Sequence, residues 1–341
     1  MGKMRILLIM DPGVPVPPAL YGGHERLVYL FAEEYQKLGH EVTLLAGPES
    51  HCSGKTVTYG TNDLSRPRAE RFKEAIFVWR YLRKNRDNFD LVHNFGRLAY
   101  LLPILNHRVK KIMSYGRKVT ASGIRVMNLL PNKNIVYTAC SDYCVSSGNV
   151  AGRWETVYNA LNFDDYHLQP IVSDDAPLIL LSRLDKIKGP HIAIQVALKT
   201  GNKLILAGNL PSTPDNIAYY KELVEPYIDQ EKIIYVGEVN DEQKNHWLGL
   251  SKAMLFPLSG DEAFGLVMIE AMACGTPVIA FNHAAAPEVI DENISGYIAN
   301  SEESMIQCLE KIPLIDRTAC REIAKKRFDA TIIARQYLEL L

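Results

Sequence analysis

The chain has 341 residues, of which 47% are apolar and 23% are charged. This composition is typical of a globular protein, and the length predicts two α/β domains because a single core rarely grows so large. No run approaches the roughly 18 consecutive apolar residues that a transmembrane helix needs, so we expect no membrane span. The apolar residues near the start predict a first strand rather than a signal peptide, and the six cysteines show no paired framework. We therefore expect a cytoplasmic protein with free thiols.

Lysine and arginine are concentrated in the first half of the chain. Residues 1–162 hold 22 Lys and Arg against 13 Asp and Glu, a net charge of +9, whereas the remaining residues carry a net charge of −10. Such a split predicts two units with different partners. A basic first unit suits an anionic acceptor or a peripheral contact with the inner face of an anionic membrane. It is equally consistent with charges that only keep the domain soluble. We expect no nucleic-acid partner.

Apolar runs separated by helical patterns organise the first unit. Runs at residues 4–10 and 41–46 predict buried parallel strands. Between them, apolar residues recur at helical spacing from Glu25 to Leu38, and Gly39 follows where a helix is expected to end. Further strands are predicted at residues 90–93, 111–114 and 135–140.

Residues 66–86 form a predicted helix that is rich in Arg and Lys. Its core-facing side is predicted from apolar residues at helical spacing, namely Phe72, Ile76, Trp79 and Leu82. The basic residues predict a solvated face, with a membrane-facing one as the alternative. They are Arg66, Arg68, Arg71, Lys73, Arg80, Arg83, Lys84 and Arg86.

The second unit repeats the alternation of strands and helices. Five strands are predicted, at residues 178–182, 203–207, 232–236, 253–256 and 277–280. We place the amino-terminal domain at residues 1–162, the carboxy-terminal domain at 163–328, and a last helix at 329–341. Alternating strands and helices of this kind predict two Rossmann-like, doubly wound α/β domains.

The stretch that carries most chemical information is residues 261–280, which read DEAFGLVMIEAMACGTPVIA. It follows a predicted strand and opens a helix, whose first N–H groups and positive dipole end suit a diphosphate. Gly265 lets the backbone approach a phosphate closely. Glu262 lies in the loop, where a carboxylate can bind sugar hydroxyls, and Glu270 lies about two turns into the helix.

The two glutamates, the Phe264-Gly265-Leu266 segment between them and the residues that follow closely resemble the signature of glycosyltransferase family 4, of GT-B fold. The resemblance implies two Rossmann-like domains facing across a cleft, the first binding the acceptor and the second the nucleotide-sugar donor. The last helix, at residues 329–341, is then expected to cross back to the first domain, as it does in the family. It also implies transfer with retention and without a metal. Glu262 is then expected to hold hydroxyls of the donor sugar, and Glu270 the ribose. The other donor-binding residues that it implies in this stretch are Ala263, Phe264, Gly265, Leu266 and Val267.

A second match lies in residues 182–189, which read SRLDKIKG after a predicted strand. They resemble the family's Gly-Arg-Leu…Lys-Gly loop, with Ser182 in place of the usual glycine. Arg183 and Lys188 are then expected to neutralise the donor diphosphate and to stabilise it as it leaves, because charge-assisted bonds to phosphate are about twice as strong as neutral ones.

A third match lies in residues 21–26, which read YGGHER between the first strand and the first helix. They resemble the family's Gly-Gly-x-Glu turn, so Gly22 and Gly23 are expected to pack against the donor diphosphate. The loop before them is long and rich in proline, which does not fit a dinucleotide fingerprint. The alternative is a plain glycine entry into the helix.

Two positions depart from the family pattern. Tyr115 precedes Gly116 where many relatives carry a histidine that lines the sugar pocket, and residues 158–162 lack the family's usual glycine and aspartate. The identity of the sugar therefore stays open. His93 follows a predicted strand and matches a frequent family histidine. It is expected either near the sugar or acceptor pocket with Tyr115 or as a core histidine with satisfied hydrogen bonds.

Together these motifs predict a retaining, metal-independent glycosyltransferase that uses a nucleoside-diphosphate sugar, with UDP favoured, and needs no other cofactor. The expected acceptor is a hydroxyl group, lipid-linked if the protein builds a surface polysaccharide or glycolipid. Two alternatives remain: a GT-B sugar-nucleotide epimerase or hydrolase, and a catalytically silent protein that binds sugar nucleotides. No Ser-His-Asp, His-Glu-x-x-His or Walker pattern supports a hydrolase or NTPase of another fold.

Overall fold

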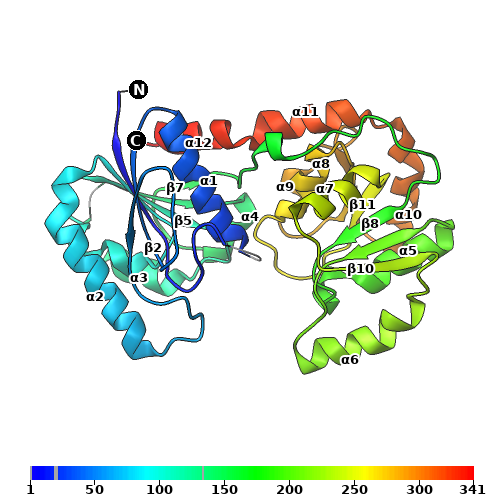
Figure 1. Cartoon of the computed structure of the whole chain (residues 1–341), viewed down its shortest axis with the longest axis horizontal. Coiled ribbons are helices and arrows are strands. Elements are labelled where there is room, and N and C mark those ends of the chain that lie inside the picture. Colours follow the sequence, from blue (N-terminus) through cyan, green and yellow to red (C-terminus); the bar gives the residue numbers. More distant parts are fainter. Residues whose placement is uncertain (1, 19–21, 133) are drawn as a thin grey trace. The chain divides into compact units, whose positions relative to one another are not determined.

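The computed structural model of the chain describes residues 2–18, 22–132 and 134–341 (Figure 1). The chain divides into two compact units: unit 1 comprises Met1–Leu161 and Ala330–Leu341, and unit 2 comprises Asn162–Asp329. None of the helices in the described ranges combines the length and hydropathy of a transmembrane segment.

Unit 1 is built on a seven-stranded sheet in the order β3-β2-β1-β4-β5-β6-β7, and all of its strand pairs are parallel. The order reverses between β1 and β4. The central strands are apolar because helices cover both faces of such a sheet, and Ile6 to Ile9 are fully buried. The strands are β1 (Arg5–Ile9), β2 (Glu41–Ala46), β3 (Lys55–Thr58), β4 (Leu91–Asn94), β5 (Lys110–Tyr115), β6 (Ile135–Ala139) and β7 (Trp154–Thr156).

Among the described residues, four helices of unit 1 precede unit 2 in the sequence, and a fifth follows it. In α1, the buried residues Leu27, Val28, Phe31 and Tyr35 recur at helical spacing, and Gly39 follows the helix with a positive φ of 89°. The helices are α1 (Gly23–Lys37), α2 (Arg68–Asn85), α3 (Ala121–Asn128), α4 (Asp142–Gly148) and α12 (Ala330–Glu339), with short 3₁₀ turns at η1 (Arg86–Asn88) and η2 (Leu98–Ile104).

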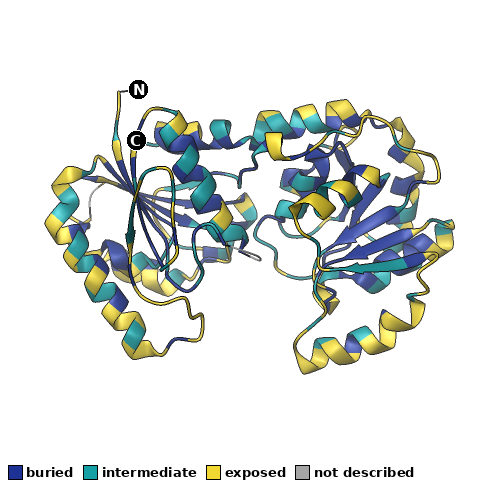
Figure 2. Ribbon diagram, in the orientation of Figure 1, coloured by how far each residue is buried: buried dark blue, intermediate teal, exposed yellow. Residues whose placement is uncertain are grey.

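Unit 2 is built on a six-stranded parallel sheet in the order β10-β9-β8-β11-β12-β13. Here the order reverses between β8 and β11. Figure 2 shows the buried strands of both units in dark blue and the exposed helix faces in yellow. The strands are β8 (Leu178–Leu181), β9 (Leu204–Ala207), β10 (Ile233–Gly237), β11 (Ala253–Phe256), β12 (Val278–Phe281) and β13 (Gly296–Ala299).

The helices of unit 2 alternate with its strands. They are α5 (Pro190–Thr200), α6 (Pro214–Leu223), α7 (Asp241–Leu250), α8 (Leu266–Ala273), α9 (Ala286–Val289), α10 (Glu302–Lys311) and α11 (Arg317–Phe328). The 3₁₀ turns are η3 (Phe163–Asp165), η4 (Lys186–Lys188), η5 (Glu225–Tyr227) and η6 (Ile312–Leu314). Arg317 connects several segments of this unit, because its buried guanidinium donates hydrogen bonds to the carbonyls of Gln169, Gly249 and Ser251.

All ten predicted strands are confirmed, with ends that differ by at most one residue. Three short strands, β3, β7 and β13, were not predicted; each lies at an edge of its sheet, where a strand needs no apolar run. The expected core side of the helix over residues 66–86 is partly wrong. Phe72 is 59% exposed, and the buried residues of α2 are Glu74, Val78 and Leu82.

Arg66 is also buried, so it does not belong to the exposed basic face of the helix. Its guanidinium lies 2.5 Å from the Glu74 carboxylate, and Arg97 holds the other oxygen of Glu74 at 2.8 Å. Glu74 is buried as well. A buried carboxylate needs such partners because an unpaired one is costly.

Helix α12 completes the core of unit 1. Tyr337 is buried, and its ring centroid lies 4.5 Å from that of His93 and 5.2 Å from that of Phe31. The Thr331 hydroxyl donates a hydrogen bond to the buried Glu34 carboxylate of α1 at 2.8 Å. The core of unit 1 therefore depends on a segment that lies far from the rest of the unit in sequence.

We predict that Tyr337→Ala will lower the free energy of unfolding of unit 1 by about 3–5 kcal/mol, as is usual when a large buried aromatic side chain is removed. Amide hydrogen exchange of β4 and β5, followed by mass spectrometry, measures the stability of unit 1 alone, because both strands belong to that unit. Gln336→Ala, at an exposed position of the same helix, is the control and should change little. Equal protection in both variants would contradict a structural role for this ring.

Candidate functional site

The site in unit 2 lies at the carboxyl ends of β8 and β11. These neighbouring strands mark the point where the strand order reverses. In open α/β sheets, ligands bind beside the carboxyl ends of the strands at such a point. The loop after β8 carries Arg183 and Lys188, and the loop after β11 carries Glu262.

The structure brings Lys188 and Glu262 together. The Lys188 Nζ atom lies 2.5 Å from Glu262 Oε2, and both side chains are partly buried. Gly189 makes this approach feasible: its φ is 70°, and a Cβ atom there would lie 2.4 Å from the Pro257 carbonyl oxygen. The backbone N–H of Ser259 also donates to the Ile187 carbonyl at 2.9 Å. The two loops are thus fixed to each other beside the ion pair.

Arg183 belongs to the same loop but contacts a different carboxylate. Its guanidinium lies 3.0 Å from the buried Asp185, and its side chain is 53% exposed. An exposed guanidinium with a single ionic partner retains free N–H donors for an incoming anion.

Helix α8 begins beside this pair. Gly265 is its N-cap, with a φ of 85°, and a Cβ atom there would lie 2.8 Å from the Met268 methyl group. The Phe264 side chain is buried and packs edge-to-face against Phe328, with ring centroids 5.7 Å apart. Phe264 therefore anchors the loop through its side chain. Leu266 and Val267 lie in the first turn, where backbone N–H groups have no acceptor within the helix, and Ala263 is half-buried in the loop before it.

Glu270 lies in the second turn of α8 and has two donors on one carboxylate oxygen. Lys244 Nζ is 2.6 Å from Glu270 Oε1, and the Tyr166 hydroxyl donates to the same oxygen at 3.0 Å. Burial and the adjacent Glu270 carboxylate raise the pKa of the Tyr166 hydroxyl above its usual value. Tyr166 is therefore a neutral donor at physiological pH.

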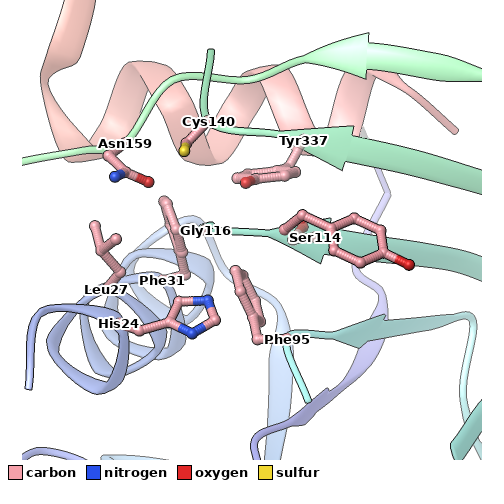
Figure 3. Close-up of a pocket in the computed structure, with 10 residues that line it drawn as sticks. His24, Leu27, Phe31, Phe95, Ser114, Gly116, Cys140, Asn159 and Tyr337 are labelled. Carbon is pink, nitrogen blue, oxygen red and sulfur yellow. The ribbon is translucent and has the colours of Figure 1, made fainter. Parts of the chain in front are cut away.

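A separate small cavity of about 10 Å³ lies in unit 1 (Figure 3). His24, Phe31 and Phe95 line it together with Ser114, Gly116 and Tyr337. The His24 ring fits against Gly116, where a Cβ atom would lie 3.2 Å from two ring atoms. Burial, with a smaller contribution from Arg117, lowers the pKa of His24 to about 4, so its imidazole is neutral near pH 7.

The two pocket residues expected in unit 1 occupy different surroundings. Tyr115 lines this cavity and lies beside Trp154, with ring centroids 5.7 Å apart. His93 is fully buried: its Nδ1 atom is 3.1 Å from the Tyr35 hydroxyl, and its Nε2 atom is 2.8 Å from Ser114 Oγ. Burial lowers the pKa of His93 to about 3. Both ring nitrogens have partners, which favours the core interpretation of this histidine.

The glycine turn lies at the start of α1. Gly23 is its first residue, and a Cβ atom at Gly22 would lie 2.8 Å from the Pro18 ring, so no other residue fits there without a shift. Tyr21, the first residue of the motif, lies outside the described residues. Glu25 is half-buried, and burial raises the pKa of its carboxyl group.

Several residues of these sites were not singled out by the sequence, among them Lys244, Tyr166, Tyr337 and His24. Lys244 and Tyr166 contact Glu270 from positions 26 and 104 residues away, and no local pattern indicates either contact. Tyr337 reaches the cavity from the other end of the chain. His24 lies inside the glycine motif, so its position there was the one available signal. In residues 2–18, 22–132 and 134–341, no group of three or more His, Cys, Asp or Glu side chains is placed to hold a metal ion.

Two family models match the chain, one in each unit. Residues 168–327 match Glycosyl transferases group 1, and residues 21–118 match Glycosyltransferase Family 4. Both matches contain the motifs described above, since the first includes Arg183, Lys188, Glu262 and Glu270 and the second includes the glycine turn.

Individual relatives agree with these matches. The gpi3 subunit of phosphatidylinositol N-acetylglucosaminyltransferase from Schizosaccharomyces pombe is 24% identical over 85% of this chain and 70% of its own length. An N-acetylgalactosaminyltransferase from Campylobacter jejuni, named for a diphospho-undecaprenol-linked substrate, is 30% identical over 55% of this chain and 53% of its own. Among solved structures, HepE of Anabaena in complex with UDP has the same fold, with a TM-score of 0.75, 18% identity and coverage of 98% and 99% of the two chains. Each unit of the chain thus matches a glycosyltransferase model, Glycosyltransferase Family 4 in unit 1 and Glycosyl transferases group 1 in unit 2, and the fold is that of GT-B glycosyltransferases.

Proposed function

We propose that this protein transfers a sugar from a nucleoside-diphosphate donor, with UDP as the favoured nucleotide, to a hydroxyl acceptor, and that the transfer retains the anomeric configuration. The observation that carries the proposal is the Lys188–Glu262 pair beside the first turn of α8. This pair places a cation that can bind phosphate next to a carboxylate that can bind sugar hydroxyls. It lies where the strand order of the sheet reverses, between β8 and β11. HepE, which shares the fold, is a precedent for UDP.

The donor diphosphate is proposed to bind between the positive end of α8 and the side chains of Arg183 and Lys188. Two cations and a helix N-terminus supply the charge stabilisation that a divalent metal supplies in other transferases. Their effect grows as the sugar–phosphate bond breaks, because negative charge then accumulates on the leaving diphosphate. We therefore propose that catalysis needs no metal and no further cofactor.

The anomeric configuration is proposed to be retained because the acceptor hydroxyl attacks the sugar from the same face from which the diphosphate leaves. The leaving phosphate oxygen takes the proton of the acceptor hydroxyl, and the sugar–oxygen bond to the acceptor forms on that side. Glu262 orients the sugar, with one carboxylate oxygen held by Lys188. In this arrangement no side chain is required as a nucleophile.

We further propose that the acceptor is lipid-linked and that unit 1 contacts an anionic membrane. The relatives named above act on phosphatidylinositol or on a diphospho-undecaprenol substrate, according to their names. Helix α2 presents exposed Phe72 and Phe77 among exposed basic residues, a combination suited to an anionic lipid surface. The basic residues exposed on this helix are Arg68, Arg71, Lys73, Arg80, Arg83 and Lys84.

The first prediction from this proposal concerns the nucleotide. UDP at about 100 times its dissociation constant should stabilise the protein by about 2.7 kcal/mol, and EDTA should not change the effect. Differential scanning fluorimetry with UDP, GDP and ADP, each with and without EDTA, measures both points. Stabilisation that EDTA abolishes and Mn²⁺ restores would contradict binding without a metal.

The second prediction concerns the two cations. Arg183→Ala and Lys188→Ala should each lower kcat by one to three orders of magnitude, because each removes charge stabilisation that is greatest in the transition state. Lys186→Ala, at an exposed position in the same loop, is the matched control and should keep kcat within about threefold. Measuring the amounts of transferred sugar and of hydrolysed donor among the products distinguishes a transferase from a hydrolase or epimerase. If the protein turned over no donor with any acceptor, a catalytically silent binding protein would be favoured.

The third prediction concerns the membrane. The wild-type protein should cosediment with vesicles containing anionic lipid at low salt, and binding should fall steeply with ionic strength, since the Debye length is only about 8 Å at physiological salt. A triple variant should bind these vesicles more weakly, with a loss of about 1 kcal/mol of binding free energy for each charge removed. It combines Arg80→Gln, Arg83→Gln and Lys84→Gln. A control of equal charge change combines Lys221→Gln, Lys232→Gln and Lys326→Gln on unit 2, all exposed, and should bind as the wild type does. If neither wild type nor control binds, a soluble acceptor is the better interpretation.

A further inference from the structure

The carboxylate of Glu270 is held from one side. Lys244 Nζ and the Tyr166 hydroxyl both contact Oε1, at 2.6 and 3.0 Å. For Oε2, no hydrogen bond from the residues that the structure describes is found. Glu270 is thus fixed through one oxygen while the other remains able to accept a hydrogen bond from a ligand.

This contact is partly shielded from water. The side chains of Lys244 and Glu270 are only 16% and 12% exposed, so their attraction is stronger than that of a surface pair. Burial alone would lower the pKa of Lys244, but the Glu270 and Asp241 carboxylates outweigh it and raise the pKa. Lys244 therefore stays charged while it holds Glu270.

The two donors are themselves positioned by the fold. Lys244 lies in α7, which begins at a capping box formed by Asn240 and Gln243. Asn245 of the same helix donates to the Asp165 carbonyl at 2.9 Å and accepts from the His167 backbone N–H at 3.0 Å. The segment that carries Tyr166 is in this way fixed to the helix that carries Lys244.

We propose that Lys244, assisted by Tyr166, is a positioning residue that orients Glu270 so that its free oxygen accepts the ribose hydroxyls of the donor nucleotide. The inference deepens the proposed function and rests on it. Glu270 supplies the contact with the ribose, whereas Lys244 acts through Glu270. A carboxylate already fixed in its binding geometry loses less conformational entropy when the ligand arrives, which increases affinity.

The experiment compares the affinity of UDP with that of 2′,3′-dideoxy-UDP, which lacks both ribose hydroxyls. A hydrogen bond to a charged group is worth about 1.5–3 kcal/mol, so the wild type should prefer UDP by at least about tenfold in isothermal titration calorimetry. Lys244→Met should reduce this preference to about threefold or less, mainly by weakening UDP binding. Glu270→Gln should reduce it similarly, and the double variant should show no further loss, because the two residues act in one interaction.

The matched control is Lys199→Met. Lys199 also forms an ion pair of 2.6 Å with a glutamate of unit 2, Glu302, but it lies in α5, away from Glu270 in the sequence and the sheet order. This variant should keep the wild-type preference for UDP. Tyr166→Phe removes the second donor without unpairing a buried charge, so it provides a test if Lys244→Met does not fold, and it should give an intermediate preference. Lys244→Arg should restore part of the preference.

The outcomes separate this inference from the function on which it rests. If the wild type binds none of UDP, GDP and ADP, the proposed function is wrong and the inference falls with it. If the wild type prefers UDP over the dideoxy analogue and Lys244→Met and Tyr166→Phe keep that preference, the donor site stands and the positioning role is overturned. A uniform loss of affinity for both ligands in Lys244→Met would indicate a general structural role and would also overturn it.

Discussion

The parallel pairing of β8 with β11 is the constraint on which the site in unit 2 depends. Parallel strands end at the same edge of a sheet, so their loops meet there. The register pairs Ala253 with Leu178 and Met254 with Ile179, which fixes where the two strand ends lie relative to each other. Gly189 and Pro257 then allow the two loops to touch. The contact between Lys188 and Glu262 follows from this arrangement although the residues are 74 positions apart.

Two lysine–glutamate ion pairs of the same kind occur in the site. Each glutamate is paired through one oxygen with a lysine, Glu262 with Lys188 and Glu270 with Lys244. These pairs leave the carboxylates neutralised and fixed before any ligand arrives, so a negatively charged donor meets less repulsion and less disorder. Arg183 is more exposed and is paired with Asp185. Lys188 and Lys244 are therefore held more firmly by the protein than Arg183 is.

The sequence predicted the central strands because their apolar runs are long and buried on both faces of the sheet. It did not predict β3, β7 and β13, which are short edge strands. It also assigned Phe72 to the core, since helical spacing identifies an apolar face but not whether another element covers it. The motif residues after β8 and β11 were predicted as one site from their resemblance to the motifs of glycosyltransferase family 4. Lys244 and Tyr166 could not be predicted, because their contacts with Glu270 depend on the packing of α7 and of residues 163–167 around α8.

The discontinuity of unit 1 has a consequence for the order of folding during synthesis. Residues 1–161 are made first, but their core lacks α12 until residues 330–341 have been made. Unit 2 is continuous in sequence and can complete its own core earlier, although domains usually fold in order from the amino terminus. During that interval unit 1 exposes the apolar surface of α1 that Tyr337 later covers, a surface that a chaperone or a second unfinished chain can bind. A substitution that weakens α12 therefore acts on the last folding step of the first unit.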